Sequence, residues 1–299
     1  MTGCTLCPRR CGADRAVSRG YCGSGEKLRI ARAALHFWEE PPVSGTRGSG
    51  AIFFTGCSLR CVFCQNSTIS AENAHGRDFD TAEFIALMQS LESEGAHNIN
   101  LVTPTHFAGQ IAAALRQYKP RVPVVYNCGG YESAETLRSL EGLVDVYLPD
   151  FKYADDALAV RLSNAPDYRE TARRALLEMV RQTGENVYNG DGLLQRGVVV
   201  RHLILPAHTR NSLAVLDLLA AEFPAVPVSL MAQYVPMGRV PEEAQFADVN
   251  RRVTAREYRK VLDHMMALGL DGFCQERSAA KARYVPDFTQ FDEPCEEEA

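Results

Sequence analysis

The sequence predicts an α/β protein, an incomplete (β/α)6 barrel that carries a small cysteine-rich cap at its amino terminus. About six short apolar strands alternate with helical segments, three cysteines follow the first strand in one loop, and four more lie within the first 27 residues. Strands that alternate with helices form parallel sheets through right-handed crossovers. We therefore expect a metal-binding cap over 1–27, a lid segment over 28–50, the barrel over 51–270, and a covering segment with an acidic tail over 271–299.

The apolar runs predict strands at 51–54, 99–102, 122–126, 143–148, 197–205 and 226–231. Two helix starts are marked by the sequence pattern of a capping box, Asp80 with Glu83 and Thr254 with Glu257. Apolar residues at helical spacing continue these helices to Gly95 and Gly269. The remaining helices are predicted at about 107–118, 132–140, 155–182 and 211–222.

Composition narrows the class of protein. The chain has 299 residues, is 46% hydrophobic and carries a formal charge of −5 without a long basic run, which argues against binding to nucleic acid. No apolar run approaches the roughly 20 residues that span a bilayer, and the first residues lack the apolar core of a signal peptide. Ten cysteines without such a signal indicate metal binding in a reducing cytoplasm.

The most specific motif is Cys57-x3-Cys61-x2-Cys64, which directly follows the strand at 51–54. Thiolates select zinc, copper(I) or iron–sulfur clusters. A four-iron cluster held by three thiolates keeps one iron open to another ligand. The residues alone also allow structural cysteines, or a closed zinc or electron-transfer site in which Cys128 or Cys274 supplies the fourth thiolate.

The cap contains Cys4, Cys7, Cys11 and Cys22. A segment with so little apolar content cannot form a hydrophobic core of its own. The four cysteines could instead hold it together by binding one metal. The sequence leaves open whether this second site holds an auxiliary iron–sulfur cluster, a structural zinc or no metal.

With Phe63 directly before the third cysteine, the motif resembles the signature of the radical S-adenosylmethionine (SAM) enzymes. Their fold is the same partial barrel, whose reactive groups gather at the carboxyl ends of the strands. The segments 55–66, 148–152 and 198–206 further resemble pyruvate formate-lyase activating enzymes. The whole chain, with its amino-terminal cysteines and Val102-Thr103-Pro104-Thr105-His106, resembles uncharacterised homologues of those activators.

This resemblance implies that Cys57, Cys61 and Cys64 hold a [4Fe–4S] cluster. It places Phe63 and Asn66 near the adenine of SAM. The ribose or methionine portion of SAM would be contacted by Asn127, Asp150, Lys152 and Arg201. Charged groups of both signs suit a zwitterion beside a sulfonium.

The chain also departs from the family pattern. Radical SAM enzymes commonly carry Gly-Gly-Glu after the second strand, where this chain has Thr103 and Thr105, which we take as its replacements. The similar segment Gly129-Gly130-Tyr131-Glu132 follows the wrong strand, and we treat it as unrelated. Asn127 stands where activators tend to have Asp, and Gln233-Tyr234 where they have His.

The resemblance implies reductive cleavage of SAM to a 5′-deoxyadenosyl radical, which abstracts hydrogen from a substrate. By that likeness the substrate is a glycyl residue of a partner protein, and the electron donor is a flavodoxin or ferredoxin. The alternative substrates are another protein, a peptide or a small molecule. The rival from a different class is a non-enzymatic binding or electron-transfer protein with a four-cysteine metal site.

Overall fold

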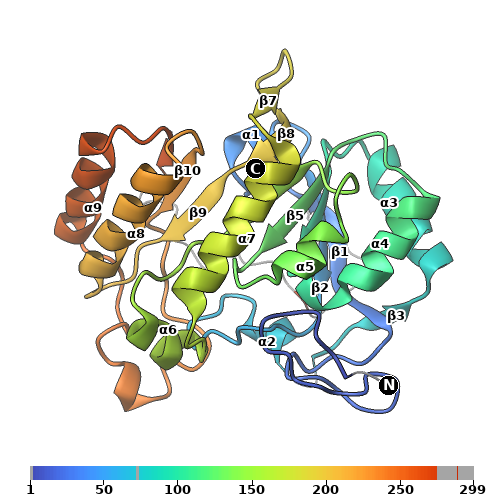
Figure 1. Ribbon diagram of the computed structural model, residues 1–299, viewed down its shortest axis with the longest axis horizontal. Helices are drawn as coiled ribbons and strands as arrows, with labels where there is room; N and C mark the ends of the chain where they lie inside the picture. The colour runs from blue at the N-terminus through green and yellow to red at the C-terminus, as the bar shows by residue number, and fades with distance from the viewer. Residues whose placement is uncertain (1–2, 72–73, 275–287, 289–299) are drawn as a thin grey trace.

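The computed structural model describes residues 3–71, 74–274 and 288, and its central feature is a curved wall of parallel strands (Figure 1). All six predicted strand regions are present, in the predicted order, and the α/β barrel is confirmed. They are β2 (Ser49–Phe54), β4 (Ile99–Val102), β5 (Val124–Cys128), β6 (Val146–Pro149), β9 (Val200–Leu203) and β10 (Val228–Met231). A further strand, β11 (Gly272–Cys274), pairs in parallel with β10, two residues beyond the predicted end of the barrel.

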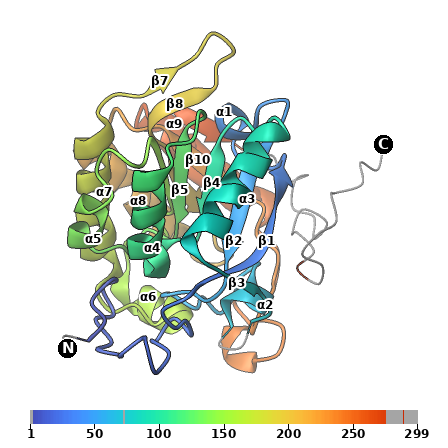
Figure 2. The same cartoon turned by 90° about the vertical axis from the view of Figure 1, so that its right-hand side faces the viewer.

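The predicted strand at 197–205 is two strands in the structure. β8 (Leu194–Val198) pairs with β6, whereas β9 pairs with β10. The change of partner falls between Val199, whose N–H donates to Tyr147, and Val200, whose N–H donates to Pro227. β8 also forms an antiparallel hairpin with β7 (Val187–Tyr188), which projects from the end of the barrel opposite the cap (Figures 1 and 2).

Side chains alternate between the two faces of each strand. In β2, Ile52 and Phe54 are buried against the helices, whereas Phe53 faces the inside of the barrel. The same alternation turns Asn127, Asp150 and Arg201 inward, and the backbones of Asp150 and Arg201 pair at the point where the sheets of β6 and β9 meet. Polar side chains from separate strands thus share one interior space.

Helices cover the outer face of the strands (Figure 2). Both predicted capping boxes are formed: Asp80 and Glu83 begin α3 (Thr81–Ser93), and Thr254 and Glu257 begin α9 (Ala255–Ala267). The others are α4 (Ala108–Gln117), α5 (Ala134–Arg138), α6 (Asp156–Ser163), α7 (Tyr168–Thr183) and α8 (Thr209–Glu222). Within the described residues, no helix has both the length and the apolar character needed to cross a membrane.

The lid segment forms β1 (Leu28–His36), which pairs antiparallel with β2 and with β3 (Arg77–Phe79), and then the short helix α1 (Pro41–Ser44). From the predicted covering segment, Phe288 packs edge-on against Phe53, with ring centroids 5.4 Å apart. The predicted acidic tail, with Cys295, lies outside the described residues.

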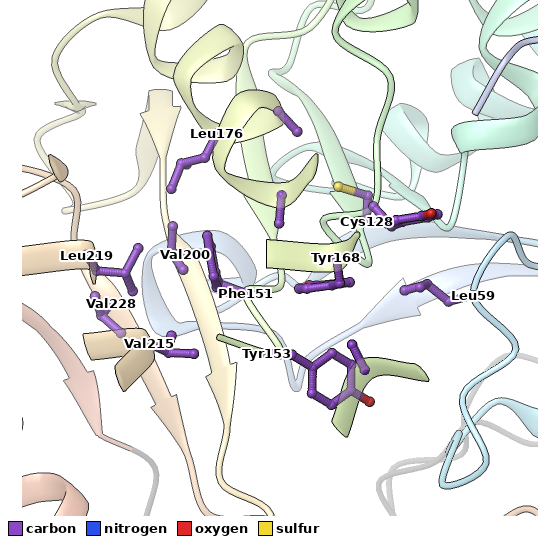
Figure 3. Packing of buried hydrophobic residues seen from close by; sticks show 14 of the residues in the cluster. Leu59, Cys128, Phe151, Tyr153, Tyr168, Leu176, Val200, Val215, Leu219 and Val228 are labelled. Carbon is purple, nitrogen blue, oxygen red and sulfur yellow. The ribbon is translucent and has the colours of Figure 1, made fainter. Parts of the chain in front are cut away.

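A buried tyrosine on α7 fixes the loops that follow β5 and β6. The ring of Tyr168 makes edge contacts with the rings of Phe151 and Tyr153 in the core (Figure 3). Its hydroxyl accepts from the Lys152 N–H at 2.9 Å and lies 2.8 Å from the Gly129 carbonyl, to which it donates. A core residue therefore holds, by hydrogen bonds, the backbone that carries the side chains of Asp150 and Lys152.

Candidate functional site

The three motif cysteines lie in the loop between β2 and the short helix α2 (Ser67–Ser70). Each sulfur has a hydrogen-bond donor: the Leu59 N–H lies 3.4 Å from Cys57 Sγ, Ser163 Oγ 2.9 Å from Cys61 Sγ and Ser70 Oγ 3.6 Å from Cys64 Sγ. The loop is tied to the barrel because the Val62 N–H donates to Leu162 and its carbonyl accepts from Arg239. These contacts hold the sulfurs in a defined place.

The donor set fits an iron–sulfur cluster. Burial, followed by the charges on Cys61 and Cys57, raises the pKa of Cys64 to about 12. The three sulfurs are therefore close enough to repel one another as thiolates. A bound cationic centre removes this repulsion and favours the thiolate form. Thiolates are also the usual ligands of such clusters.

Cys61 and Cys64 line a cavity of about 480 Å³ inside the barrel, a size common for small-molecule and cofactor sites. Seven of the eight residues predicted to contact SAM line the same cavity. They are Phe63, Asn66, Thr103, Asn127, Asp150, Lys152 and Arg201. Residues from five separate strands or their loops therefore meet at the cluster loop, as the sequence predicted.

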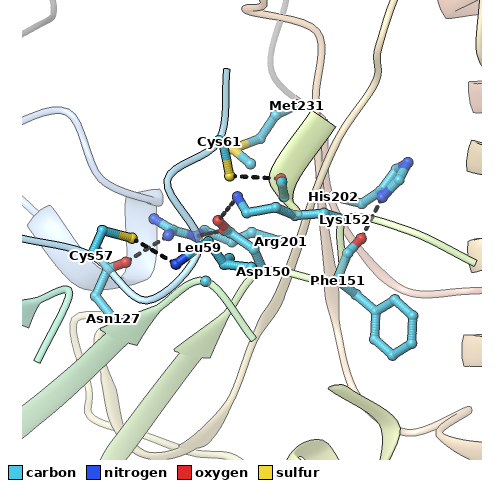
Figure 4. A network of polar contacts seen from close by, with 12 residues as sticks. Cys57, Leu59, Cys61, Asn127, Asp150, Phe151, Lys152, Arg201, His202 and Met231 are labelled. Carbon is cyan, nitrogen blue, oxygen red and sulfur yellow. Dashed lines mark hydrogen bonds and ion pairs between the residues drawn. The ribbon is translucent and has the colours of Figure 1, made fainter. Parts of the chain in front are cut away.

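A charged network runs through this cavity (Figure 4). Arg201 Nε donates to Asp150 Oδ1 at 2.9 Å, and Lys152 Nζ contacts the other oxygen of Asp150. Burial would raise the pKa of Asp150, but Arg201 and Lys152 outweigh it and hold that pKa below its ordinary value. Burial lowers the pKa of Lys152, but Asp150 and the charge on Cys61 together outweigh burial and raise that pKa to about 12. Asp150 is therefore negatively charged at neutral pH, and Lys152 and Arg201 are positively charged.

Glu39 belongs to this network, and sequence reasoning missed it. Its carboxylate accepts from Asn100 at 3.2 Å, from Asn127 at 3.1 Å and from Arg201 at 3.2 Å, and only 10% of the side chain is exposed. Glu39 comes from the lid segment, whose acidic pair Glu39-Glu40 among aromatic residues was the available signal. The lid thus reaches into the barrel, with His36, Phe37 and Trp38 also on the cavity wall.

The two threonines predicted to replace Gly-Gly-Glu are placed differently. Thr103 lines the cavity and has a φ of +61°, which is rare for a β-branched residue and typical of functional sites. Thr105 is not among the cavity-lining residues: it is buried, and its hydroxyl donates to Glu132 at 2.8 Å. Glu132 also accepts from the Tyr126 hydroxyl at 3.0 Å and is not among the residues that line the cavity, whereas Gly129 of the same segment does line it.

We expect Glu132 to make stability depend on pH. Burial raises its pKa from 4.5 to about 7, so the folded protein retains a proton that the unfolded chain loses, and this stabilisation fades as the pH rises from about 4.5 to 7. The free energy of unfolding of Glu132→Gln, relative to that of the wild type, should therefore increase by about 3 kcal/mol as the pH rises from 4 to 8. Denaturant unfolding at several pH values measures this, with exposed Glu185→Gln as control; a pH-independent difference would contradict it.

The cap cysteines lie near one another and against the barrel. A Cβ added to Gly20 would lie 3.3 Å from Cys11 Sγ and 3.5 Å from Cys22 Sγ. Among residues 3–71, 74–274 and 288, no three Cys, His, Asp or Glu side chains are grouped so as to hold a single metal ion. The second metal site in the cap therefore stays a prediction.

Comparison with known proteins identifies the class. The Radical SAM superfamily profile matches residues 51–219, which is more than half of the chain and includes the three-cysteine loop and most of the barrel. The chain therefore belongs to the radical SAM superfamily, and it is a radical SAM enzyme whose family uses a [4Fe–4S] cluster and SAM.

A curated relative is the uncharacterised protein MJ0674 of Methanocaldococcus jannaschii, which is 29% identical over 277 residues, covering 90% of this chain and 75% of MJ0674. Similar solved structures include methylornithine synthase (PylB), at 14% identity and a TM-score of 0.48 over 88% of this chain and 79% of PylB. Another is Streptococcus suis SuiB, at 10% identity and a TM-score of 0.48 over 76% of this chain. The match spans 47% of SuiB, about half its length.

Proposed function

We propose that this radical SAM enzyme binds SAM in the 480 Å³ cavity and acts on a glycyl residue of a partner protein, as the activating enzymes that it resembles do. The observation that carries the first part is that two motif cysteines and seven predicted SAM contacts line one cavity. When bound, the cluster and SAM supply a one-electron reductive cleavage that leads to hydrogen abstraction from the substrate.

In this proposal, Cys57, Cys61 and Cys64 hold the cluster, and Phe63 and Asn66 border the adenine. Asp150 binds the cationic part of SAM, and Lys152 and Arg201 bind its carboxylate, because ionised groups form the strongest hydrogen bonds.

Two further contacts complete the proposed SAM site. Asn127 supplies an amide to the ribose or methionine portion. Thr103 replaces the missing Gly-Gly-Glu, with its hydroxyl or carbonyl contacting the amino group of SAM. Its strained backbone conformation supports this role.

The first test uses anaerobic protein reconstituted with iron and sulfide, then reduced with dithionite and supplied with SAM. We expect 5′-deoxyadenosine in proportion to the cluster content, and none from protein without iron. A fully loaded four-iron protein that binds no SAM would contradict the proposal.

The glycyl substrate needs a separate test. Phe37 and Trp38 border the cavity and are 39% and 59% exposed, which supports access by a chain segment from outside. We would incubate the active enzyme with extract of its source cells grown on α-deuterated glycine. Deuterium in the 5′-deoxyadenosine is expected, with unlabelled extract as control. Turnover without deuterium would point to a different protein, a peptide or a small molecule as substrate.

The cap supports another prediction. Replacing Cys4, Cys7, Cys11 and Cys22 together by serine should lower the metal content while SAM cleavage with dithionite persists, because Cys57, Cys61 and Cys64 are unchanged. Iron and zinc analysis beside the 5′-deoxyadenosine assay measures this and distinguishes an iron–sulfur cluster from zinc. Loss of cleavage with the barrel cluster intact would instead assign the cap to electron delivery.

A further inference from the structure

The cap differs in charge from the rest of the chain. Residues 1–27 contain five basic and two acidic side chains, a net charge of +3, whereas the whole chain carries −5. An acidic protein that gathers positive charge in one place attracts partners of opposite charge to that place. The basic residues of the cap are Arg9, Arg10, Arg15, Arg19 and Lys27.

Part of this charge lines a groove of about 370 Å³ between the cap and the barrel. Among the described residues that line the groove, four are basic and two are acidic: Arg15, Arg19 and Lys27 of the cap and Arg29 of β1, against Glu26 and Asp78. Val17 also lines the groove and is 84% exposed. In protein–protein interfaces, apolar residues lie at the centre and polar residues form the rim, and Val17 with its charged neighbours could take these places.

The barrel wall of this groove is the backbone that leads into the cluster loop. Thr55 and Gly56 line the groove directly before Cys57. The cap is joined to them because the Cys57 N–H donates to the Cys22 carbonyl at 3.1 Å and Ser24 Oγ donates to the Thr55 carbonyl at 3.2 Å. Gly56 has a φ of +80°, and a Cβ there would lie 2.5 Å from the Cys22 carbonyl oxygen, so the contact requires glycine. The groove is therefore lined by the residue that directly precedes a predicted cluster ligand, Cys57.

We propose that this groove, the cap groove, docks an acidic one-electron donor protein. The inference rests on the proposed function, which requires one electron from outside for each SAM molecule cleaved. The donor is oxidised by one electron, and the carbon–sulfur bond of SAM that receives this electron breaks. Opposite charges speed the encounter and orient the donor, and Val17 supplies an apolar centre for the contact.

Two side chains are suited to test the cap groove. Arg19 and Lys27 both line the groove, and their side chains are exposed. Arg15 and Arg29 are half-buried and are left unchanged. The test variant is therefore Arg19→Glu with Lys27→Glu. Its control, Arg259→Glu with Lys260→Glu, makes the same charge change at exposed positions on α9, far from the cap in Figure 1.

The probes are an acidic flavodoxin and an acidic [2Fe–2S] ferredoxin, and the readout is their dissociation constant for the intact protein at 50 mM and 300 mM salt. We expect at least one probe to bind the wild type and the control alike, and to bind the cap-groove variant at least tenfold more weakly at low salt. The difference should shrink at high salt, because screening weakens exposed charge pairs. Equal binding by all three proteins, or no binding of either probe at 50 mM salt, would overturn the proposal.

A second readout separates this proposal from the proposed function. With dithionite as reductant, all three proteins should form 5′-deoxyadenosine at the same rate, whereas with the probe protein as reductant only the cap-groove variant should be slow. An equal rate with the probe protein would reject the docking site alone. Absence of product from the iron-loaded wild type with dithionite would instead count against the proposed function.

Discussion

Cys61→Ala is expected to lose the barrel cluster and all measurable SAM cleavage. Cys61 Sγ lies on the cavity wall and receives a hydrogen bond from Ser163 at 2.9 Å, so both its position and its environment suit a ligand. Changing an outer-shell partner of a metal already costs about 10–100-fold in affinity or activity. We expect a larger loss for a direct ligand, measured as iron and sulfide content and as 5′-deoxyadenosine formed under dithionite.

The matched control is Cys128→Ala, which separates an open three-cysteine cluster from a closed four-cysteine site. Cys128 is buried at the end of β5 and lines the same cavity, so it is the nearest test of the rival function. Burial raises the pKa of its thiol well above the ordinary value, and Glu132 raises it further, which favours a neutral thiol. We expect this variant to keep its iron. Equal loss of iron from both variants would favour the four-thiolate protein.

Arg201→Met is expected to lower the free energy of unfolding at pH 7 by about 3–5 kcal/mol, because removing one partner leaves buried charge uncompensated. Arg201 contacts Asp150 at 2.9 Å and Glu39 at 3.2 Å, and each of these side chains is at most 15% exposed. SAM binding should be lost as well. Denaturant unfolding and equilibrium binding measure the two effects, with the exposed Arg259→Met as control.

A second substitution tests whether Glu39 is the cause. Adding Glu39→Gln to Arg201→Met removes one uncompensated carboxylate and should restore part of the lost stability. Without Arg201, the pKa values of Asp150 and Glu39 should rise, so the single variant should recover stability as the pH is lowered and lose it as the pH rises. If Glu39→Gln restored nothing at any pH, Glu39 would not be a partner that needs Arg201.

The residues that the sequence placed correctly depend on short-range rules. The cysteine spacing lies within eight residues, both capping boxes span four, and the alternation along strands turns Asn127, Asp150 and Arg201 inward. Each rule acts between near neighbours in the chain, so it can be applied without knowing the sheet. The order of the parallel strands followed because right-handed crossovers leave few arrangements.

The sequence by itself thus determined the superfamily motif and the barrel, and it predicted seven SAM contacts that line the cavity. Only the tertiary structure decided that Glu39 enters the barrel, that Thr105 turns to Glu132, and that the strand at 197–205 divides between two sheets. Glu39 meets Asn127 and Arg201 across 88 and 162 residues of chain. Contacts between residues so far apart in the chain depend on the curvature of the sheets and on the register of their strands. No local sequence pattern specifies either. The cap groove arises in the same way, where the Cys22 carbonyl meets the Cys57 N–H.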